Sequence, residues 1–305
     1  MILITGITGK SGLYFFQNII NDKKLKNEKF RIVVRQTSNT DFIDKSGICI
    51  EKAIGDLNNL KFIEKAMKDI DVVFHIAGIH FSLNVIEAAI KNNVKWVILV
   101  HTTGIFSKYK SAAARYRDIE NRINLLKTNS KLDLTILRPT MIYGDIEDRN
   151  ISIFIKVVDK IKIIPVINNG NYHLQPVHAK DLGNAYYQVL LNKSKTKNKC
   201  YNLSGREPIL LIDMLKIISK ELGVSRSFFS VPFPVAYAGA WILFAISFGN
   251  IDYREKVQRM IESRAFSHED AENDFGYNPM SFQEGIKDEI FKYKQRMKKS
   301  EFHIS

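Results

Sequence analysis

Three glycines at three-residue spacing, directly after an apolar run at the N-terminus, constrain the fold of this chain most strongly. Met1–Thr5 is short and apolar, which predicts a buried parallel strand, and Lys10–Ile20 has the spacing of an amphipathic helix. Gly6, Gly9 and Gly12 form the turn that joins them. A strand, a glycine-rich turn and a helix in this order are typical of a phosphate-binding unit and predict a dinucleotide-binding Rossmann domain.

Each residue of the turn has an expected task. Gly6 permits the tight turn, Gly9 lets the phosphates approach the backbone, and Gly12 lets the helix pack closely on the strand. Thr8 and Lys10 belong to the same turn and are included among the predicted cofactor contacts. The alternative interpretation is a glycine-rich turn in a Rossmann domain that binds no nucleotide.

The first half of the chain alternates apolar runs with helical patterns, which predicts an α/β fold with a doubly wound parallel sheet covered by helices on both faces. Further strands are predicted at Phe30–Arg35, Ile48–Ile54, Val72–Ile76, Trp96–Val100 and Leu132–Leu137.

After Pro139 the alternation breaks, and from Glu207 onward the pattern is mostly helical. We therefore predict a smaller, mostly helical C-terminal substrate lobe. Residues 1–145 are assigned to the NAD(P)-binding Rossmann domain, with 170–205 interleaved, and residues 146–305 mainly to the substrate lobe.

The residues that close the second predicted strand indicate which cofactor is used. An acidic residue at this position binds the ribose hydroxyls of NAD, but this chain has Arg35, whose planar guanidinium suits a 2′-phosphate. Ser38 adds a hydroxyl donor nearby. The sequence therefore predicts NADP(H) as the preferred cofactor and leaves NAD(H) as the alternative. The other interpretation of Arg35 is an exposed charge at a strand end.

Further cofactor contacts are predicted where the next two strands end. Asp56 and Leu57 follow the third strand, where this fold contacts adenine, although Asp56 is equally suited to cap the helix that follows. Ala77 and Gly78 end the fourth strand, where small residues let a cofactor pass close to the backbone.

The composition argues against several other classes of protein. The net charge is +13, from 45 basic and 32 acidic residues, but the lysines are scattered and lack interleaved aromatics, which favours a solvated surface and no nucleic-acid partner.

Cys49 and Cys200 are far apart, which fits a reducing compartment and predicts no metal site. The N-terminus has no basic region or cleavage site of a signal peptide, so we expect a cytoplasmic protein.

Four motifs in the right order give this chain a resemblance to a known family. They are the Thr-Gly-x-x-Gly-x-x-Gly turn, Leu137–Gly144 with its Arg-Pro and Tyr-Gly pairs, Gln175–Leu182 with Val-His and Asp-Leu, and Phe266–Pro279 with Phe-Gly-Tyr-Asn-Pro. Together they resemble the extended and atypical short-chain dehydrogenase/reductase family, which includes the NAD-dependent epimerases and dehydratases.

The resemblance implies a small-molecule substrate of the nucleotide-sugar class, on which extended members act as epimerases, dehydratases and keto-reductases. It places Pro139 near the cofactor and implies a homodimer formed through the helix predicted at Ser111–Leu126. Family chemistry uses a tyrosine, a lysine four residues later and an upstream serine or threonine. Tyr116, Thr102 and Thr103 occupy the tyrosine and threonine positions.

The lysine of this arrangement is absent. Position 120 is Glu120, and none of the twelve tyrosines has a lysine four residues on. On a helix, Glu120 shares a face with Tyr116, and we expect its negative charge to raise the phenol pKa. Two alternatives follow: Lys108 or Lys110 folds over the site of a working enzyme, or the protein is a non-catalytic NADPH-binding sensor or regulator.

An uncharged segment, Pro234–Phe248, is too short to span a membrane, which takes about 20 apolar residues. We predict a helix buried under the substrate lobe. The alternative is a helix in the membrane interface, helped by Trp241 and Tyr237, and this would make the protein a membrane-peripheral lipid- or sterol-type oxidoreductase.

Overall fold

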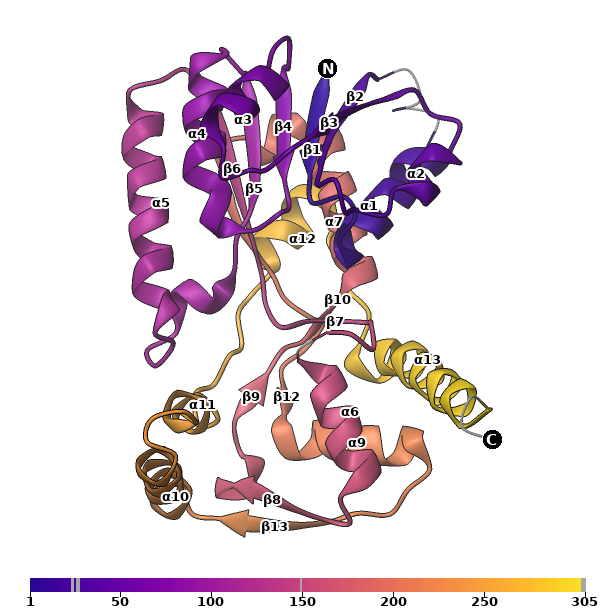
Figure 1. Ribbon diagram of the computed structural model, residues 1–305, viewed down its shortest axis with the longest axis vertical. Helices are drawn as coiled ribbons and strands as arrows, with labels where there is room; N and C mark the ends of the chain where they lie inside the picture. The colour runs from indigo at the N-terminus through magenta and orange to yellow at the C-terminus, as the bar shows by residue number, and fades with distance from the viewer. Residues whose placement is uncertain (23–24, 26–27, 149, 303–305) are drawn as a thin grey trace.

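The computed structural model describes residues 1–22, 25, 28–148 and 150–302 of the chain (Figure 1). Its centre is a sheet of seven parallel strands in the order β3-β2-β1-β4-β5-β6-β11, which confirms the predicted doubly wound Rossmann class. The strands are β1 (Ile2–Thr5), β2 (Phe30–Val34), β3 (Ile50–Ile54), β4 (Val72–His75), β5 (Trp96–Val100), β6 (Asp133–Pro139) and β11 (Cys200–Leu203).

Helices cover both faces of this sheet, as Figure 1 shows. One face is covered by α3 (Leu60–Ala66), α4 (Ser82–Lys91) and α5 (Ala112–Thr128), and the other by α1 (Lys10–Asn21), α7 (Ala179–Leu191) and α12 (Glu269–Phe275). Because neighbouring residues of a strand face opposite sides, Leu3 packs in one core while Ile2 and Ile4 pack in the other. Two short helices, α2 (Asp41–Asp44) and α8 (Lys193–Thr196), complete this part.

The remaining segments form the smaller lobe, which has a third core of its own. That core is built by α6 (Ile151–Lys160), α9 (Leu211–Leu222) and α13 (Phe282–Phe302). The strands of the lobe pair as β8 (Ile163–Ile167) with β13 (Ser227–Val231), β9 (His173–Leu174) with β12 (Ile209–Leu210), and β7 (Ile142–Tyr143) with β10 (Val177–His178). The lobe is therefore largely helical, although β12 and β13 lie in the region predicted to be mostly helical.

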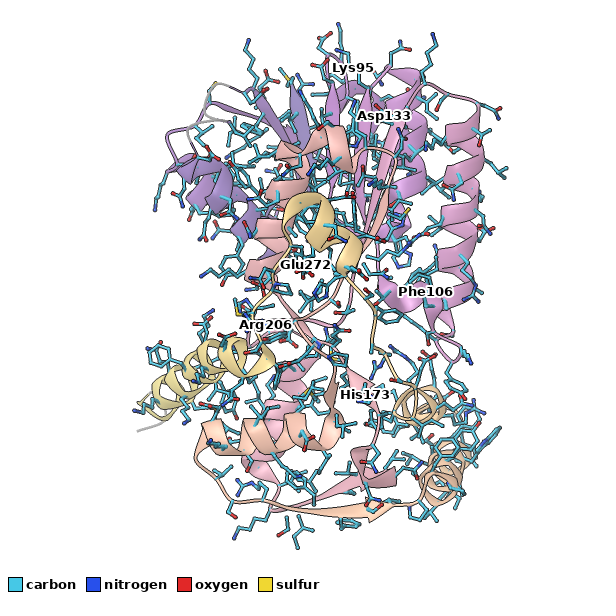
Figure 2. All side chains as sticks on the ribbon, turned by 180° about the vertical axis from the view of Figure 1, so that it is seen from behind. Lys95, Phe106, Asp133, His173, Arg206 and Glu272 are labelled. Carbon is cyan, nitrogen blue, oxygen red and sulfur yellow. The ribbon has the colours of Figure 1, made fainter. Side chains whose placement is uncertain are left out.

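The chain passes between the two parts several times. Within residues 170–205, β9 pairs inside the lobe, whereas α7 packs against α1 and β11 adds the seventh strand to the sheet. Near the C-terminus α12 returns to the sheet, where Ala271 and Phe275 join the core shared with α1 and α7. This last return, visible from behind in Figure 2 where Glu272 is labelled on α12, is not evident from the sequence.

One segment of the lobe differs from its prediction. The uncharged segment forms α10 (Phe233–Ile246), followed by α11 (Arg254–Arg259), but Ala240 is the one buried residue of α10. The prediction of a buried helix is therefore wrong, because the lobe core is filled by α6, α9 and α13. In the described ranges, no helix is long and apolar enough to cross a membrane.

The packing of α1 on α7 depends on Gly183, where an added Cβ atom would collide with the Tyr14 Cβ and lie 2.6 Å from the Phe15 backbone nitrogen. Gly183→Ala should therefore lower the free energy of unfolding by about 1–3 kcal/mol, because the helices must move apart. The matched control is Gly239→Ala in α10, where no atom lies within 4 Å of an added Cβ. There the better helix propensity should raise stability by about 0.5–1 kcal/mol. Urea unfolding followed by circular dichroism compares them; equal effects would contradict this packing.

Candidate functional site

The glycine turn holds α1 very close to the sheet. Gly6 has a φ of 76°, and a Cβ atom there would lie 2.6 Å from the Ala77 backbone nitrogen. A Cβ atom on Gly12 would lie 2.5 Å from the Gly6 carbonyl oxygen. Gly9 is the N-terminal cap residue of α1, and no described side chain caps this end of the helix. The first backbone N–H groups of α1 are therefore available to an anion such as a pyrophosphate.

A cavity of 460 Å³ opens beside this turn, at the carboxyl ends of β1, β2, β3 and β4. It is lined by seven predicted cofactor residues, namely Gly6, Thr8, Gly9, Arg35, Asp56, Leu57 and Ala77, together with Ser11, Val33, Val34, Ser38, Gly55, Ile76 and Phe81. Lys10, Gly12 and Gly78 lie outside this lining, and Lys10 is ion-paired with Asp145 at 2.7 Å. Pro139 lines a second cavity instead. The residues around the turn thus fit a dinucleotide.

Arg35 and Ser38 form a tight turn at the edge of this cavity. The Ser38 hydroxyl accepts a hydrogen bond from the Arg35 backbone N–H at 3.1 Å, and the Ser38 N–H donates to the Arg35 carbonyl at 2.9 Å. The hydroxyl proton of Ser38 and the exposed guanidinium of Arg35 both remain able to donate to a phosphate.

Asp56 lines the cavity and does not cap the next helix, α3. Asn59 is the N-cap of α3 and accepts a hydrogen bond from the Phe62 N–H at 3.1 Å. Asp56 instead accepts from the Asn58 N–H at 2.8 Å, which forms a local turn. The capping alternative for Asp56 is therefore wrong, and one carboxylate oxygen has no part in that turn.

A buried histidine joins the ends of β1 and β4 next to the glycine turn. Burial lowers the pKa of His75 to about 4, so its ring is neutral. Nε2 lies 2.9 Å from the Gly78 carbonyl, which can only accept, so Nε2 carries the proton. Nδ1 then accepts from the Thr5 hydroxyl at 2.7 Å. These bonds fix the edge of the sheet at which the cofactor cavity opens.

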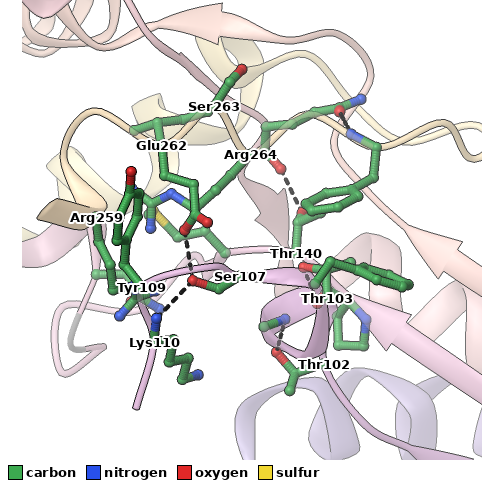
Figure 3. Close-up of a pocket in the computed structure, with 18 of the residues that line it drawn as sticks. Thr102, Thr103, Ser107, Tyr109, Lys110, Thr140, Arg259, Glu262, Ser263 and Arg264 are labelled. Atoms are coloured by element: carbon green, nitrogen blue, oxygen red, sulfur yellow. Dashed lines mark hydrogen bonds between the residues drawn. The ribbon is translucent and has the colours of Figure 1, made fainter. Parts of the chain in front are cut away.

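The second cavity has a volume of 650 Å³ and lies at the ends of β5 and β6 (Figure 3). Both predicted threonines line it. The Thr103 hydroxyl donates to the Pro139 carbonyl at 3.3 Å, and the Thr102 hydroxyl accepts from the Gly104 N–H at 3.0 Å. Thr102 therefore keeps its hydroxyl proton for a ligand.

The tyrosine in the family position lies beside this cavity and not in its lining. Tyr116 is partly buried on α5, whereas Tyr109 is among the lining residues. Lys110 connects the two places, because it lines the cavity and its Nζ lies 4.7 Å from the centre of the Tyr116 ring. Burial, and then the charge of Arg259, lower the pKa of Lys110. Lys108 and Lys110 are the two lysines that could replace the missing family lysine, and both line the cavity.

Glu120, at the position of the family lysine, belongs to a buried network. Its carboxylate accepts two hydrogen bonds from Arg138, at 2.5 and 3.1 Å, and one from His101 Nδ1 at 2.9 Å. The other ring nitrogen of His101 lies 3.0 Å from the Ser82 hydroxyl. Burial alone would raise the pKa of Glu120, but the bonds and charges of His101 and Arg138 hold it at about 2. The negative charge of Glu120 is thus balanced by Arg138, and His101 at the neighbouring strand end adds a hydrogen bond.

The opposite wall of the cavity comes from the smaller lobe. Glu262 accepts hydrogen bonds from the Ser107 hydroxyl at 2.6 Å and from the Lys108 N–H at 2.7 Å, which join segments 154 residues apart or more. Arg259 and Arg264 lie on the same side (Figure 3). Each has a buried Nε atom without a hydrogen-bond partner among the described residues. Unpaired guanidinium donors in a cavity indicate a site for an anionic group.

These arginines and Glu262 were not predicted as site residues. In the sequence they belong to a charged stretch that follows the uncharged segment. Nothing in that stretch indicates that it lines the same cavity as Thr102 and Thr103. Within the part of the chain that the structure describes, no group of three or more His, Cys, Asp or Glu side chains is arranged to hold a metal ion.

Residues 6–157 match a protein family described as NAD(P)H-binding, so the chain contains an NAD(P)H-binding domain. No curated protein sequence matches the chain.

Solved structures share its whole fold. UDP-glucose 4-epimerase of Thermotoga maritima, with UDP-glucose, is 16% identical with a TM-score of 0.72, covering 97% of this chain and 99% of that chain. Triphenylmethane reductase of Citrobacter sp., complexed with NADP(H), is 19% identical with a TM-score of 0.71, covering 94% and 98%. A dTDP-glucose 4,6-dehydratase of Streptomyces venezuelae is 16% identical with a TM-score of 0.72, covering 96% and 97%. At these identities the likeness establishes the fold, which is the one predicted from the family resemblance.

Two buried carboxyl groups should give opposite pH dependence. The pKa of Glu120 is lowered from 4.5 to about 2, so its stabilisation is present above pH 4.5 and is lost as the pH falls. Glu120→Gln should lower the free energy of unfolding at neutral pH by about 2–4 kcal/mol, because Arg138 loses its buried counter-charge. It should also flatten the acid limb of the stability curve, measured by urea unfolding.

Glu289, a fully buried residue of α13, is the carboxyl group to compare with Glu120. Burial and the nearby Asp148 raise its pKa from 4.5 to about 9, so wild-type stability falls as the pH rises through this range. Glu289→Gln should therefore increase stability at alkaline pH. A Glu120→Gln protein as stable as wild type at neutral pH would contradict the network described for His101 and Arg138.

Proposed function

We propose that this protein, whose residues 6–157 belong to an NAD(P)H-binding family, is an NADP(H)-dependent oxidoreductase or epimerase-like enzyme. Its proposed substrate is a carbonyl or alcohol of the nucleotide-sugar type. The observation that carries this proposal is the position of the two cavities. The first lies at the ends of β1 to β4 and the second at the ends of β5 and β6, and β4 pairs with β5. Ligands of open α/β sheets bind at this edge.

The residues of the first cavity support NADP(H) over NAD(H). Arg35 and Ser38 offer charged and hydroxyl donors for a 2′-phosphate, and the uncapped N-terminus of α1 suits the pyrophosphate. Asp56 provides an acceptor for the adenine amino group. When bound, the cofactor supplies or accepts a hydride at its nicotinamide ring. The protein's own residues must then orient the substrate oxygen and move a proton.

Lys110 is the proposed proton donor in the second cavity. Its lowered pKa makes the ammonium a better acid than an exposed lysine, and it lies within the cavity lining beside Thr102. Thr102 and Thr103 orient the substrate oxygen in this proposal. Tyr116 acts by holding Lys110, because the ammonium sits over its ring.

The charges of the second cavity support an anionic substrate. Arg259, Arg264, Lys108 and Lys110 line it, against the single carboxylate of Glu262, which is occupied by Ser107 and the loop backbone. A pyrophosphate, such as a nucleotide sugar carries, would satisfy the unpaired Nε donors of Arg259 and Arg264. The epimerase neighbour is described with UDP-glucose, and this chain shares its fold.

A second candidate is a protein that binds NADPH without turnover, as a sensor or regulator. It is favoured by the replacement of the family lysine by Glu120 and by the place of Tyr116 outside the cavity lining. A homodimer through α5, where Leu125 is 68% exposed, and a cytoplasmic location remain predictions.

Cofactor preference is tested with Arg35→Ala. Loss of a charged donor to the 2′-phosphate should weaken NADPH binding by about tenfold to a hundredfold, while NADH binding stays unchanged. Titration of both nucleotides by protein fluorescence measures this. Arg122→Ala, an exposed arginine on α5, is the control and should alter neither affinity. Equal weakening of both nucleotides by Arg35→Ala would contradict the assignment of this side chain.

Turnover is tested with Lys110→Met and a UDP-linked keto-sugar. Without the proton donor, kcat should fall by about a hundredfold while NADPH affinity is retained. Lys108→Met, which removes a second lining lysine, should change KM and leave kcat close to wild type. Oxidation of NADPH followed by absorbance measures both. Tight NADPH binding with no oxidation by the wild-type protein would instead support the sensor.

A further inference from the structure

The smaller lobe carries an exposed apolar surface on the side away from the central sheet. We call it the basal surface, and it consists of α10, the residues directly after it, and the outer face of β8 and β13 (Figure 1). No charged side chain occurs between Arg226 and Asp252. Its large exposed apolar residues are Ile163, Phe229, Val235, Trp241, Ile242, Leu243, Ile246, Phe248 and Ile251.

α10 is apolar around its whole circumference and yet exposed. Within the helix Trp241 is 47% exposed and Ile246 70%, and Ala240 is the one buried residue; Phe248, directly after the helix, is 94% exposed. A helix that is apolar on all sides normally lies in a protein core or in contact with lipid. Soluble surfaces seldom carry a contiguous apolar patch of this kind without a binding partner.

The strand pair beside α10 extends the same surface. β8 and β13 are parallel, with Phe229 opposite Pro165 and Ser227 opposite Ile163. These residues face outward, whereas Ile164 and Val166 of β8 are buried in the lobe core. Because β13 leads directly into α10, strand pair and helix form one continuous base (Figure 1).

Basic residues border the basal surface at both ends. Before β13, a shallow cavity of 480 Å³ is lined by Lys216, Lys220 and Arg226, together with Phe228. After α10, the Arg254 guanidinium lies 4.2 Å from the centre of the Trp241 ring. These charges beside aromatic rings have the composition of a membrane-interface segment.

The acidic residues near the surface cancel part of this charge. Asp252 is paired with Arg254 at 2.8 Å and Asp213 with Lys216 at 3.4 Å. Lys220 and Lys256 add exposed positive charge at the two ends, and Lys256 lies over the Tyr253 ring at 4.5 Å. The positive charge that remains on Lys220, Arg226 and Lys256, in a chain of net charge +13, makes the borders of the basal surface complementary to an anionic partner.

From these observations we propose that the basal surface docks on an anionic lipid bilayer, with α10 lying in the plane of the interface. α10 has 14 residues, and no described helix is able to cross a membrane, so the contact is peripheral. A second copy of the chain fits less well, because a twofold contact would bring like basic borders together. Docking would also place the wall of the second cavity near the membrane, since α11 packs on α10 and Arg259 lines that cavity.

The test uses the full-length protein and needs no turnover, so its failure is distinguishable from failure of the proposed function. Vesicles of phosphatidylglycerol and phosphatidylcholine are compared with vesicles of phosphatidylcholine alone. The chain has two tryptophans, and Trp96 is 1% exposed whereas Trp241 is 47% exposed. A change of emission on adding vesicles therefore reports α10. We expect co-sedimentation with the anionic vesicles, a blue shift of emission, and loss of binding at high salt.

Ile242→Glu and Ile246→Glu should each weaken vesicle binding by about tenfold or more, because both place a charge in the apolar contact. Phe291→Glu, a comparably exposed apolar position on α13, is the matched control and should bind as wild type does. An unchanged far-UV circular dichroism spectrum shows that each variant is folded. Absence of both co-sedimentation and blue shift would overturn the proposal. A dimer in light scattering that Ile246→Glu dissociates, without vesicle binding, would assign the surface to a second copy.

Discussion

The close approach between the glycine turn and the end of β4 is the constraint on which the rest of the structure depends. A side chain at Gly6 would collide with the Ala77 backbone, and one at Gly12 with the Gly6 carbonyl. Because both contacts are between backbones, α1 lies directly over the ends of β1 and β4 and points its N-terminus at the first cavity. On the other side of α1, the absence of a side chain at Gly183 permits an equally close approach of α7. One helix thus joins the glycine turn to the segment that returns from the smaller lobe.

The second cavity depends on an unequal distribution of charge between its two walls. On the sheet side, Glu120 compensates Arg138 and orients His101, so the floor beneath the threonines is neutralised and rigid. On the lobe side, the Nε atoms of Arg259 and Arg264 have no hydrogen-bond partner among the described residues. A ligand that brings negative charge therefore completes the wall supplied by the smaller lobe, and the two parts of the chain meet around it.

Much of this arrangement follows from local sequence, since apolar runs predict buried strands and the glycine spacing predicts the turn. What could not be predicted depends on distant partners. Helical spacing placed Glu120 beside Tyr116, but the carboxylate bonds to residues at two strand ends instead, which only the sheet brings close. The contact of Glu262 with Ser107 crosses the two parts of the chain. α10 was predicted to be buried because apolar content indicates burial, yet the sequence does not reveal that other helices already fill the core.

The proposed function requires that a cofactor bound in the first cavity extends along the sheet edge until its nicotinamide end meets the substrate in the second cavity, beside Thr102 and Lys110. Amide hydrogen exchange with and without NADPH tests it most directly, because protection reports where backbone is covered or ordered. We expect NADPH to slow exchange both in the turn around Gly6 and Gly12 and in the segment from Thr102 to Lys110. Protection confined to the glycine turn, or no protection in either segment, would contradict it.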